Sequence, residues 1–213
     1  MDVAHPIRAV VPTLDGVVLE VLAGTTRSLS RRQVANLAGS GSESGVRLAL
    51  LRLVRQGVVL ADARGNAVYY AGNRNHLAWP AIETLARLRS ELRERLSATL
   101  AGWEVAPLHA SLFGSAARGD GDAESDVDVL LVRPDLDPAA TGPWDEQVDR
   151  LRAMVLAWAG NQCRPFELTL DRLAEHVAAG DPLMEAWLAD GVLLAGSPLS
   201  DVVRRTAPDA LAR

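Results

Sequence analysis

Lysine is absent from the 213-residue sequence, and cysteine occurs once, at Cys163. A single cysteine excludes an internal disulfide, which suits the reducing cytoplasm. Long apolar runs are also missing, since none approaches the roughly 18 to 20 residues that a membrane-spanning helix requires. The opening residues, M-D-V-A-H-P-I-R, lack the basic start, apolar core and small-residue cleavage site of a secretory signal. We therefore expect a soluble, cytoplasmic protein with no membrane partner.

Positive charge is carried by arginine alone, and it is distributed unevenly. Residues 1–75 contain nine arginines and five acidic residues, a balance of +4. The rest of the chain contains thirteen arginines and twenty-two acidic residues, a balance of −9, and the two parts together give the net charge of −5. This contrast indicates two different modules, and the chain is long enough for two small domains.

The first 75 residues have the pattern of three short helices followed by a β-hairpin. Ser30 is a suitable N-cap for the second helix, and Gly24 and Gly39 mark the ends of the first and second. A Gly-Asn pair between the two β-rich segments suits a tight hairpin. This order of elements is that of a winged helix-turn-helix. The expected helices cover 14–23, 31–38 and 44–56, and the expected strands cover 58–61 and 67–70.

Arginines on the third helix suggest a use for this module. The outer face of that helix carries Arg47, Arg52 and Arg55, and Arg64 lies on the hairpin, or wing. In DNA-binding proteins of this type the corresponding helix enters the major groove, and flanking arginines contact phosphates. The alternative is a module for dimerisation or protein binding with the arginines in solvent. In pattern the segment resembles the winged-helix domains of MarR-like regulators.

Residues 76–102 join the two modules. After Pro80, apolar residues recur at spacings of three and four, as they do in one amphipathic helix of roughly 20 residues. We expect a linker helix packed on the domain that follows, and the alternative is a coiled-coil contact in a homodimer.

Two aspartates open an apolar strand within the stretch 108–132. Asp126 and Asp128 share one face of this strand and the alternate apolar residues share the other, because successive side chains of a strand point in opposite directions. Gly114 and Ser115 follow an earlier apolar strand, and ten residues separate Ser115 from Asp126. Two neighbouring carboxylates at the start of a strand predict a metal site.

The stretch L-F-G-S-A-A-R-G-D with S-D-V-D-V-L-L-V resembles the polymerase β-like nucleotidyltransferase superfamily, and its minimal nucleotidyltransferases in particular. The resemblance covers 108–170. It implies a nucleoside triphosphate substrate, such as ATP, and one or two Mg²⁺ ions. The order of winged helix, linker helix and this domain also resembles bacterial fusions of regulator-type and nucleotidyltransferase domains.

The residue types suit that chemistry. Gly114 allows a turn in which backbone N–H groups approach a phosphate, and Ser115 can donate its hydroxyl to a triphosphate. Arg118 can neutralise a phosphate oxygen. Asp126 and Asp128 are suited to hold Mg²⁺, which takes carboxylate and phosphate oxygens.

The resemblance also implies a third carboxylate on the next strand, expected over 163–170. Glu167 is the only acidic residue of that strand and is our candidate for the third catalytic and metal ligand. The alternative alignment places Arg164 at the catalytic position, in which case the domain binds nucleotide with little or no catalysis.

We therefore expect an α/β (α+β) protein with a winged helix-turn-helix over 1–75, a linker helix over 76–102 and, over 103–213, a nucleotidyltransferase domain whose small mixed sheet is flanked by helices. The resemblance implies transfer of a nucleoside monophosphate to a hydroxyl of a protein, such as a HEPN-type toxin for which this chain is the antitoxin, or of a small molecule. The alternative function is a DNA-binding regulator whose degenerate nucleotidyltransferase domain binds nucleotide or mediates dimerisation.

Overall fold

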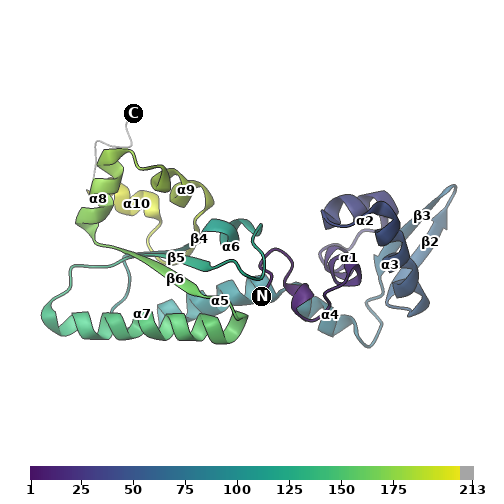
Figure 1. Cartoon of the computed structure of the whole chain (residues 1–213), viewed down its shortest axis with the longest axis horizontal. Helices are drawn as coiled ribbons and strands as arrows, with labels where there is room; N and C mark the ends of the chain where they lie inside the picture. Colours follow the sequence, from purple (N-terminus) through teal and green to yellow (C-terminus); the bar gives the residue numbers. More distant parts are fainter. Residues whose placement is uncertain (207–213) are drawn as a thin grey trace. The chain divides into compact units, whose positions relative to one another are not determined.

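The computed structural model describes residues 1–206 and has a mixed α/β fold (Figure 1). The chain divides into two compact units. One consists of Asp2 and Ala4–Arg89, and the other of Met1, Val3 and the chain from Ser90 onward. We call them the N-terminal and the C-terminal unit.

The N-terminal unit contains the three helices and the hairpin that the sequence predicts. A capping box begins the second helix, because Ser30 accepts a hydrogen bond from the backbone of Gln33 and the Gln33 side chain accepts one from the backbone of Ser30. The strands form an antiparallel sheet in the order β1-β3-β2. Up to residue 72, the elements of the N-terminal unit are a 3₁₀ turn η1 (Pro6–Ala9), helices α1 (Leu14–Ala23), α2 (Arg31–Ala38) and α3 (Glu43–Arg55), and strands β1 (Leu29–Ser30), β2 (Val59–Arg64) and β3 (Ala67–Gly72).

The single helix predicted between the modules is wrong, because the structure has two helices there. Helix α4 (Trp79–Ala86) ends at Arg87, and α5 (Leu88–Ala101) follows. The apolar side chains of α4 belong to the core of the N-terminal unit, whereas those of α5 belong to the core of the C-terminal unit. The regular apolar spacing in the sequence therefore joins two stripes that are buried in different cores.

The C-terminal unit is built on a four-stranded mixed sheet in the order β6-β5-β4-β7. Strand β5 pairs antiparallel with β4 and parallel with β6, and β4 pairs antiparallel with β7. The parallel pair is joined through α7 (Pro138–Ala159), whose N-cap is Asp137. The strands are β4 (His109–Phe113), β5 (Val127–Val132), β6 (Cys163–Leu168) and β7 (Val192–Gly196).

Helices cover both faces of this sheet (Figure 1). On one face, alternate β5 residues Val127, Val129 and Leu131 are buried with α5 and α7. On the other face, Leu130 and Val132 are buried with α8 (Leu170–Ala179), α9 (Pro182–Asp190) and α10 (Leu199–Thr206). We call these the α7 face and the α8 face. The short helix α6 (Gly114–Arg118) follows β4.

The last turns of the chain differ in part from expectation. The sequence suggests a frayed tail from Val202, but Val202 and Val203 are buried in α10 and close the core of the α8 face. Residues 207–213 of the expected tail lie outside the described residues. Among residues 1–206, no helix combines the length and the apolar character that a membrane crossing requires.

We expect Leu131→Ala to lower the free energy of unfolding by about 2 to 5 kcal/mol, because Leu131 is fully buried against α7 and a truncated side chain leaves a cavity. Leu193→Ala is the matched control, since Leu193 on β7 is 46% exposed and surface substitutions change stability by about 0.5 kcal/mol or less. Urea unfolding monitored by tryptophan fluorescence measures both values. Equal losses in the two variants would contradict the burial of Leu131 in the core of the α7 face.

Candidate functional site

The aspartate pair lies at the start of β5, on the α8 face. Asp128 is in the strand and Asp126 is two residues before it, while Val127 between them is buried on the α7 face. Burial raises the pKa of Asp128 above its usual range, and the negative charge of Asp126 raises it further, whereas Arg164 lowers it. The site therefore holds two carboxylates, and the charge of Asp126 is close enough to act on Asp128.

Gly114 brings the chain after β4 against this pair. The preceding residue, Phe113, is paired with Asp128 across the two strands. Gly114 has φ of +67°, and a Cβ at this position would lie 2.8 Å from Oδ2 of Asp128. Only glycine meets both requirements without displacing the carboxylate. The backbone turn that the sequence predicts for an anion loop is therefore directly beside the carboxylates.

Ser115 lies in α6, beside the loop that leads from this helix to β5. A Cβ on Gly121 would lie 2.7 Å from the hydroxyl of Ser115 and 2.9 Å from that of Ser125. The loop is held by its own hydrogen bonds, since the carboxylate of Asp122 accepts from the Ser125 hydroxyl at 2.9 Å and from the backbone of Glu124 at 3.0 Å. These bonds, the one from Ser125 first, lower the pKa of Asp122. Ser115 thus lies close to a loop that is held by its own hydrogen bonds.

Arg118 is engaged with protein carboxylates. It donates to Asp120 at 2.9 Å and to Asp190 of α9 at 3.2 Å. The hydrogen bonds to Asp120 and then Asp190 raise the pKa of its guanidinium. The structure therefore shows Arg118 joining α6 to α9, and its contact with a phosphate stays a prediction.

Arg164 is the residue of β6 that lies next to the aspartates. It is paired with Asp128 in the parallel register, and its Nε lies 2.9 Å from Oδ2 of Asp126. Its side chain is 72% exposed, whereas that of Asp126 is 22% exposed. The alternative alignment of the sequence, with Arg164 beside the pair, agrees with this register.

Glu167, the expected third carboxylate, lies elsewhere. It is paired with Leu131, whose side chain is on the α7 face, so the alternation of side chains places Glu167 on the opposite face of the sheet from Asp128. There it accepts a hydrogen bond from Trp144 Nε1 of α7 at 2.7 Å, and Arg152 lies 3.7 Å away. The sequence position of Glu167 identifies its strand but not how that strand is aligned with β5. For this reason the prediction that Glu167 lies beside Asp126 and Asp128 is wrong.

The remaining carboxylates still suit one mode of Mg²⁺ binding. Within residues 1–206 no group of three histidine, cysteine or acidic residues is arranged to hold a metal ion. Mg²⁺, however, is commonly held by one or two carboxylates together with substrate phosphates and water. Asp126 and Asp128 fit that mode, and the positive charge of Arg164 occupies part of the same space.

Cys163 precedes Arg164 and is buried opposite Val127. Burial raises the pKa of its thiol to about 12. The thiol is therefore protonated and is no candidate nucleophile or metal ligand.

Aromatic side chains on the α8 face were not singled out from the sequence. Trp187 of α9 lies 6.1 Å from Phe113, 5.2 Å from Phe166 and 5.6 Å from His176, measured between ring centroids. Phe166 follows Arg164 by two residues, so both point to the Asp128 side of the sheet. The alternation in C-R-P-F-E-L was the available signal, but it needed the register to be interpreted.

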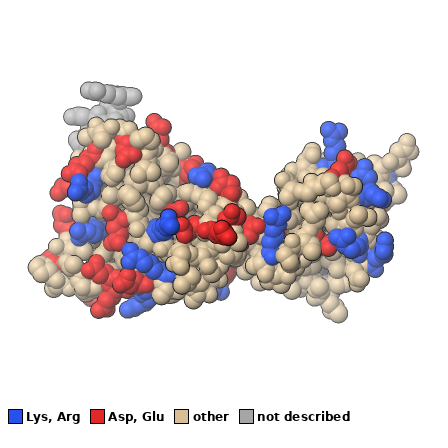
Figure 2. Space-filling model, in the orientation of Figure 1, with Lys and Arg blue, Asp and Glu red and all other residues tan. Residues whose placement is uncertain are grey.

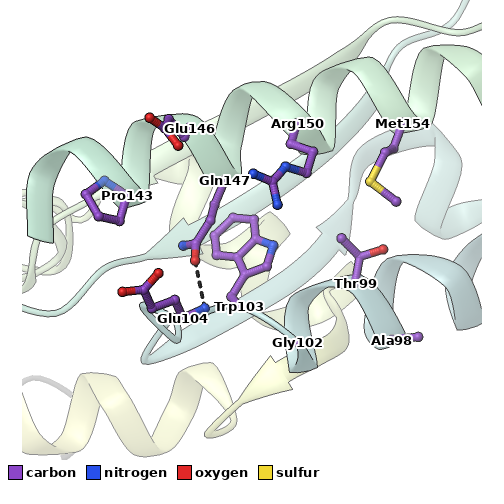
Figure 3. Close-up of a pocket in the computed structure, with 10 residues that line it drawn as sticks. All are labelled: Ala98, Thr99, Gly102, Trp103, Glu104, Pro143, Glu146, Gln147, Arg150 and Met154. Atoms are coloured by element: carbon purple, nitrogen blue, oxygen red, sulfur yellow. Dashed lines mark hydrogen bonds between the residues drawn. The ribbon is translucent and has the colours of Figure 1, made fainter.

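The α7 side of the unit contains a cavity of about 550 Å³ between α5 and α7 (Figure 3). Trp103 on its wall packs edge-on against Trp144, with 5.3 Å between ring centroids. Gln147 accepts a hydrogen bond from the backbone of Glu104 at 2.7 Å. These contacts close the core behind the sheet, on the face away from the aspartate pair.

The arginines expected to bind DNA are exposed on the N-terminal unit, where Figure 2 shows several basic side chains. Arg47 and Arg55 lie on α3, and Arg52 of the same helix pairs with Asp15 at 3.0 Å. Arg64 on β2 pairs with Asp62 at 2.7 Å and lies over the ring of Tyr69.

Comparison with known proteins found one family model that matches part of the chain. Residues 86–179 match the family model of the nucleotidyltransferase domain, a stretch that includes the glycine loop, both aspartates and Arg164. Nucleotidyl transfer is thus the general activity indicated for this domain. A comparison with solved structures found "Crystal structure of the toxin-antitoxin with AMP-PNP", 16% identical, covering 56% of this chain and 84% of that chain with a TM-score of 0.36, which is too low to describe a shared fold. Comparison with curated proteins found no match.

We expect Asp128→Asn to raise the free energy of unfolding at about pH 7. The raised pKa means that ionised Asp128 is less favourable in the folded protein than in the unfolded chain. This cost is present above the folded pKa and disappears as the pH falls below the ordinary aspartate pKa. The gain should be below about 1 kcal/mol because water screens the site, and urea unfolding should show it shrinking between about pH 7 and pH 4. A gain that does not depend on pH would contradict this.

Proposed function

We propose that the C-terminal unit binds a nucleoside triphosphate, such as ATP, together with Mg²⁺, and transfers its nucleoside monophosphate to an acceptor hydroxyl. The contact of Gly114 with Asp128 carries this proposal, because it joins a turn suited to phosphate with a carboxylate pair suited to the cation. The match of residues 86–179 to the nucleotidyltransferase domain supports the same reaction class.

In this reaction the acceptor oxygen forms a bond to the α-phosphorus, and the bond to the leaving pyrophosphate breaks. Asp126 and Asp128 would hold Mg²⁺, which when bound stabilises the attacking and leaving oxygens. The Ser115 hydroxyl would donate to a phosphate oxygen, and Arg164 would turn from Asp126 to the phosphates. The acceptor is proposed from the sequence resemblance alone: a hydroxyl of a HEPN-type partner toxin, or a small molecule.

The second candidate is nucleotide binding without transfer. Arg164 beside the aspartates and Glu167 on the opposite face favour it, because they leave the pair without a third carboxylate to accept the proton of the acceptor hydroxyl. In that case the nucleotide would act as a signal to a regulatory module.

We expect Asp126→Asn and Asp128→Asn each to weaken magnesium-dependent ATP binding at least about tenfold, because even indirect partners of metal ligands contribute about 10- to 100-fold to metal affinity. Glu167→Gln, a carboxylate removed from the α7 face, should retain magnesium-dependent binding. Titration calorimetry with and without Mg²⁺ measures these affinities.

Loss of binding in Glu167→Gln equal to that in the aspartate variants would instead return Glu167 to the site. Single-turnover incubation with labelled ATP, Mg²⁺ and candidate acceptors then separates the two candidates. Label on an acceptor with the wild type, and none with the aspartate variants, supports transfer. ATP binding without any labelled acceptor supports the second candidate.

We further propose that the N-terminal unit is a winged helix-turn-helix that binds DNA through α3. Exposed Arg47 and Arg55 on that helix, the +4 balance of residues 1–75 and the hairpin beside it support this proposal. Dimerisation through the same unit is the alternative.

For DNA binding, Arg47→Ala and Arg55→Ala should each weaken affinity for duplex DNA and reduce the slope of log K against log salt by about 1, because each lost phosphate contact releases fewer counterions. Arg93→Ala is the control, because it removes the same charge from an exposed position on α5 in the other unit. Fluorescence anisotropy at several salt concentrations gives the slope. A slope unchanged in all three variants would exclude α3 as the DNA contact.

A further inference from the structure

The edge strand β6 connects the aspartate site with a cavity farther along the strand. Arg164, Phe166 and Leu168 alternate along β6 on the α8 face, and Arg164 lies opposite Asp128. At about 3.3 Å per residue, Phe166 follows Arg164 by about 7 Å. The Phe166 side chain is 37% exposed even though it packs against Trp187. The ring of Phe166 is therefore partly exposed to solvent on the same face of the sheet as Arg164 and Asp128.

A cavity of about 440 Å³ lies at this position, between β6 and α8. Phe166 and Leu168 contribute its apolar wall. Its charged lining includes Glu167 at the edge strand and Glu175, which is paired with Arg172 at 2.6 Å. Asp181 adds a further negative charge, so the cavity disfavours a phosphate and accepts an uncharged or electron-poor group.

The polar chemistry of the cavity is set by His176. The Asp181 carboxylate caps α9 by accepting from the backbone of Leu183 at 2.9 Å, and it lies 2.6 Å from Nδ1 of His176. These contacts, that of Leu183 first, lower the pKa of Asp181, so the carboxylate is ionised and can only accept. Nδ1 therefore carries the proton that Asp181 accepts, and Nε2 is the ring nitrogen left for a ligand. Within residues 1–206, Nε2 has no hydrogen-bond partner.

We propose that this cavity binds the base of the nucleotide, stacked on Phe166, with the exocyclic group of the base against Nε2 of His176. The inference rests on the proposed function, because the phosphates must lie at Asp126, Asp128 and Arg164. Adenine and cytosine present an amine at the position where guanine and uracil present a carbonyl oxygen. A ring nitrogen at that position therefore distinguishes ATP and CTP from GTP and UTP.

The position along β6 supports a base at this end. The ribose separates the base of a nucleotide from its α-phosphate by a span comparable to the distance between Phe166 and Arg164. Aromatic side chains bind bases by stacking, which needs no charge on either group. A phosphate at the same place would meet Asp181, whereas at the other end it would meet Arg164.

The experiment compares Mg²⁺-ATP with Mg²⁺-tripolyphosphate, which has the phosphates but no base, on the full chain. Phe166→Ala should weaken ATP about tenfold, which is about 1.4 kcal/mol, the range of base stacking. It should leave tripolyphosphate unchanged. Phe166→Leu, which keeps apolar volume against Trp187 but has no ring, should show the same selective loss. His176→Ala should reduce the difference in affinity between ATP and GTP.

Leu193→Ala on the far edge strand is the matched control of similar exposure and should change neither ligand. If Phe166→Ala and Phe166→Leu leave ATP binding unchanged, or weaken both ligands equally, the base site is overturned while phosphate binding stands. An equal affinity of the wild type for ATP and GTP overturns the role of His176. If the wild type binds neither ATP nor tripolyphosphate, the proposed function fails and this inference fails with it.

Discussion

The register of β5 against its two neighbours is the constraint on which the site depends. Phe113 on one side and Arg164 on the other both lie opposite Asp128. A slip of one residue would move Val127 and its alternates out of the core of the α7 face and turn Asp128 into it, so the packing of these apolar side chains specifies the register strongly. The apolar core thus determines which charged groups meet, although none of those charges belongs to it.

In the proposed function, this group of charges would rearrange when the nucleotide binds. Arg164 offsets the repulsion between Asp126 and Asp128, and a cation would compete with it for the same carboxylate oxygen. Because exposed ion pairs contribute only about 1 kcal/mol or less, release of Arg164 costs little. Once released, a guanidinium suits phosphate oxygens better than any other side chain. In the proposed function, one arginine would therefore pair first with the carboxylates and then with the phosphates.

Local features of this site were predictable from the sequence, and long-range features were not. The glycine turn, the strand and the shared face of Asp126 and Asp128 follow from spacing and alternation within a few residues. The position of Glu167 depends on how α7 returns the chain to β6, which no local pattern encodes. The break at Arg87 was missed for a similar reason, since helical spacing does not reveal which core buries each stripe.

Cys163 gives this sheet an internal reporter. Its thiol is buried in the core of the α7 face beside β5, and burial raises its pKa to about 12, which keeps it protonated. Exchange with a soluble disulfide needs a thiolate in contact with solvent, so the rate measures how often β6 separates from β5. Because the chain contains one cysteine, that rate belongs to a single place, one residue from Arg164. Local opening of the strands beside Asp126 and Asp128 can therefore be followed through the reaction of the Cys163 thiol.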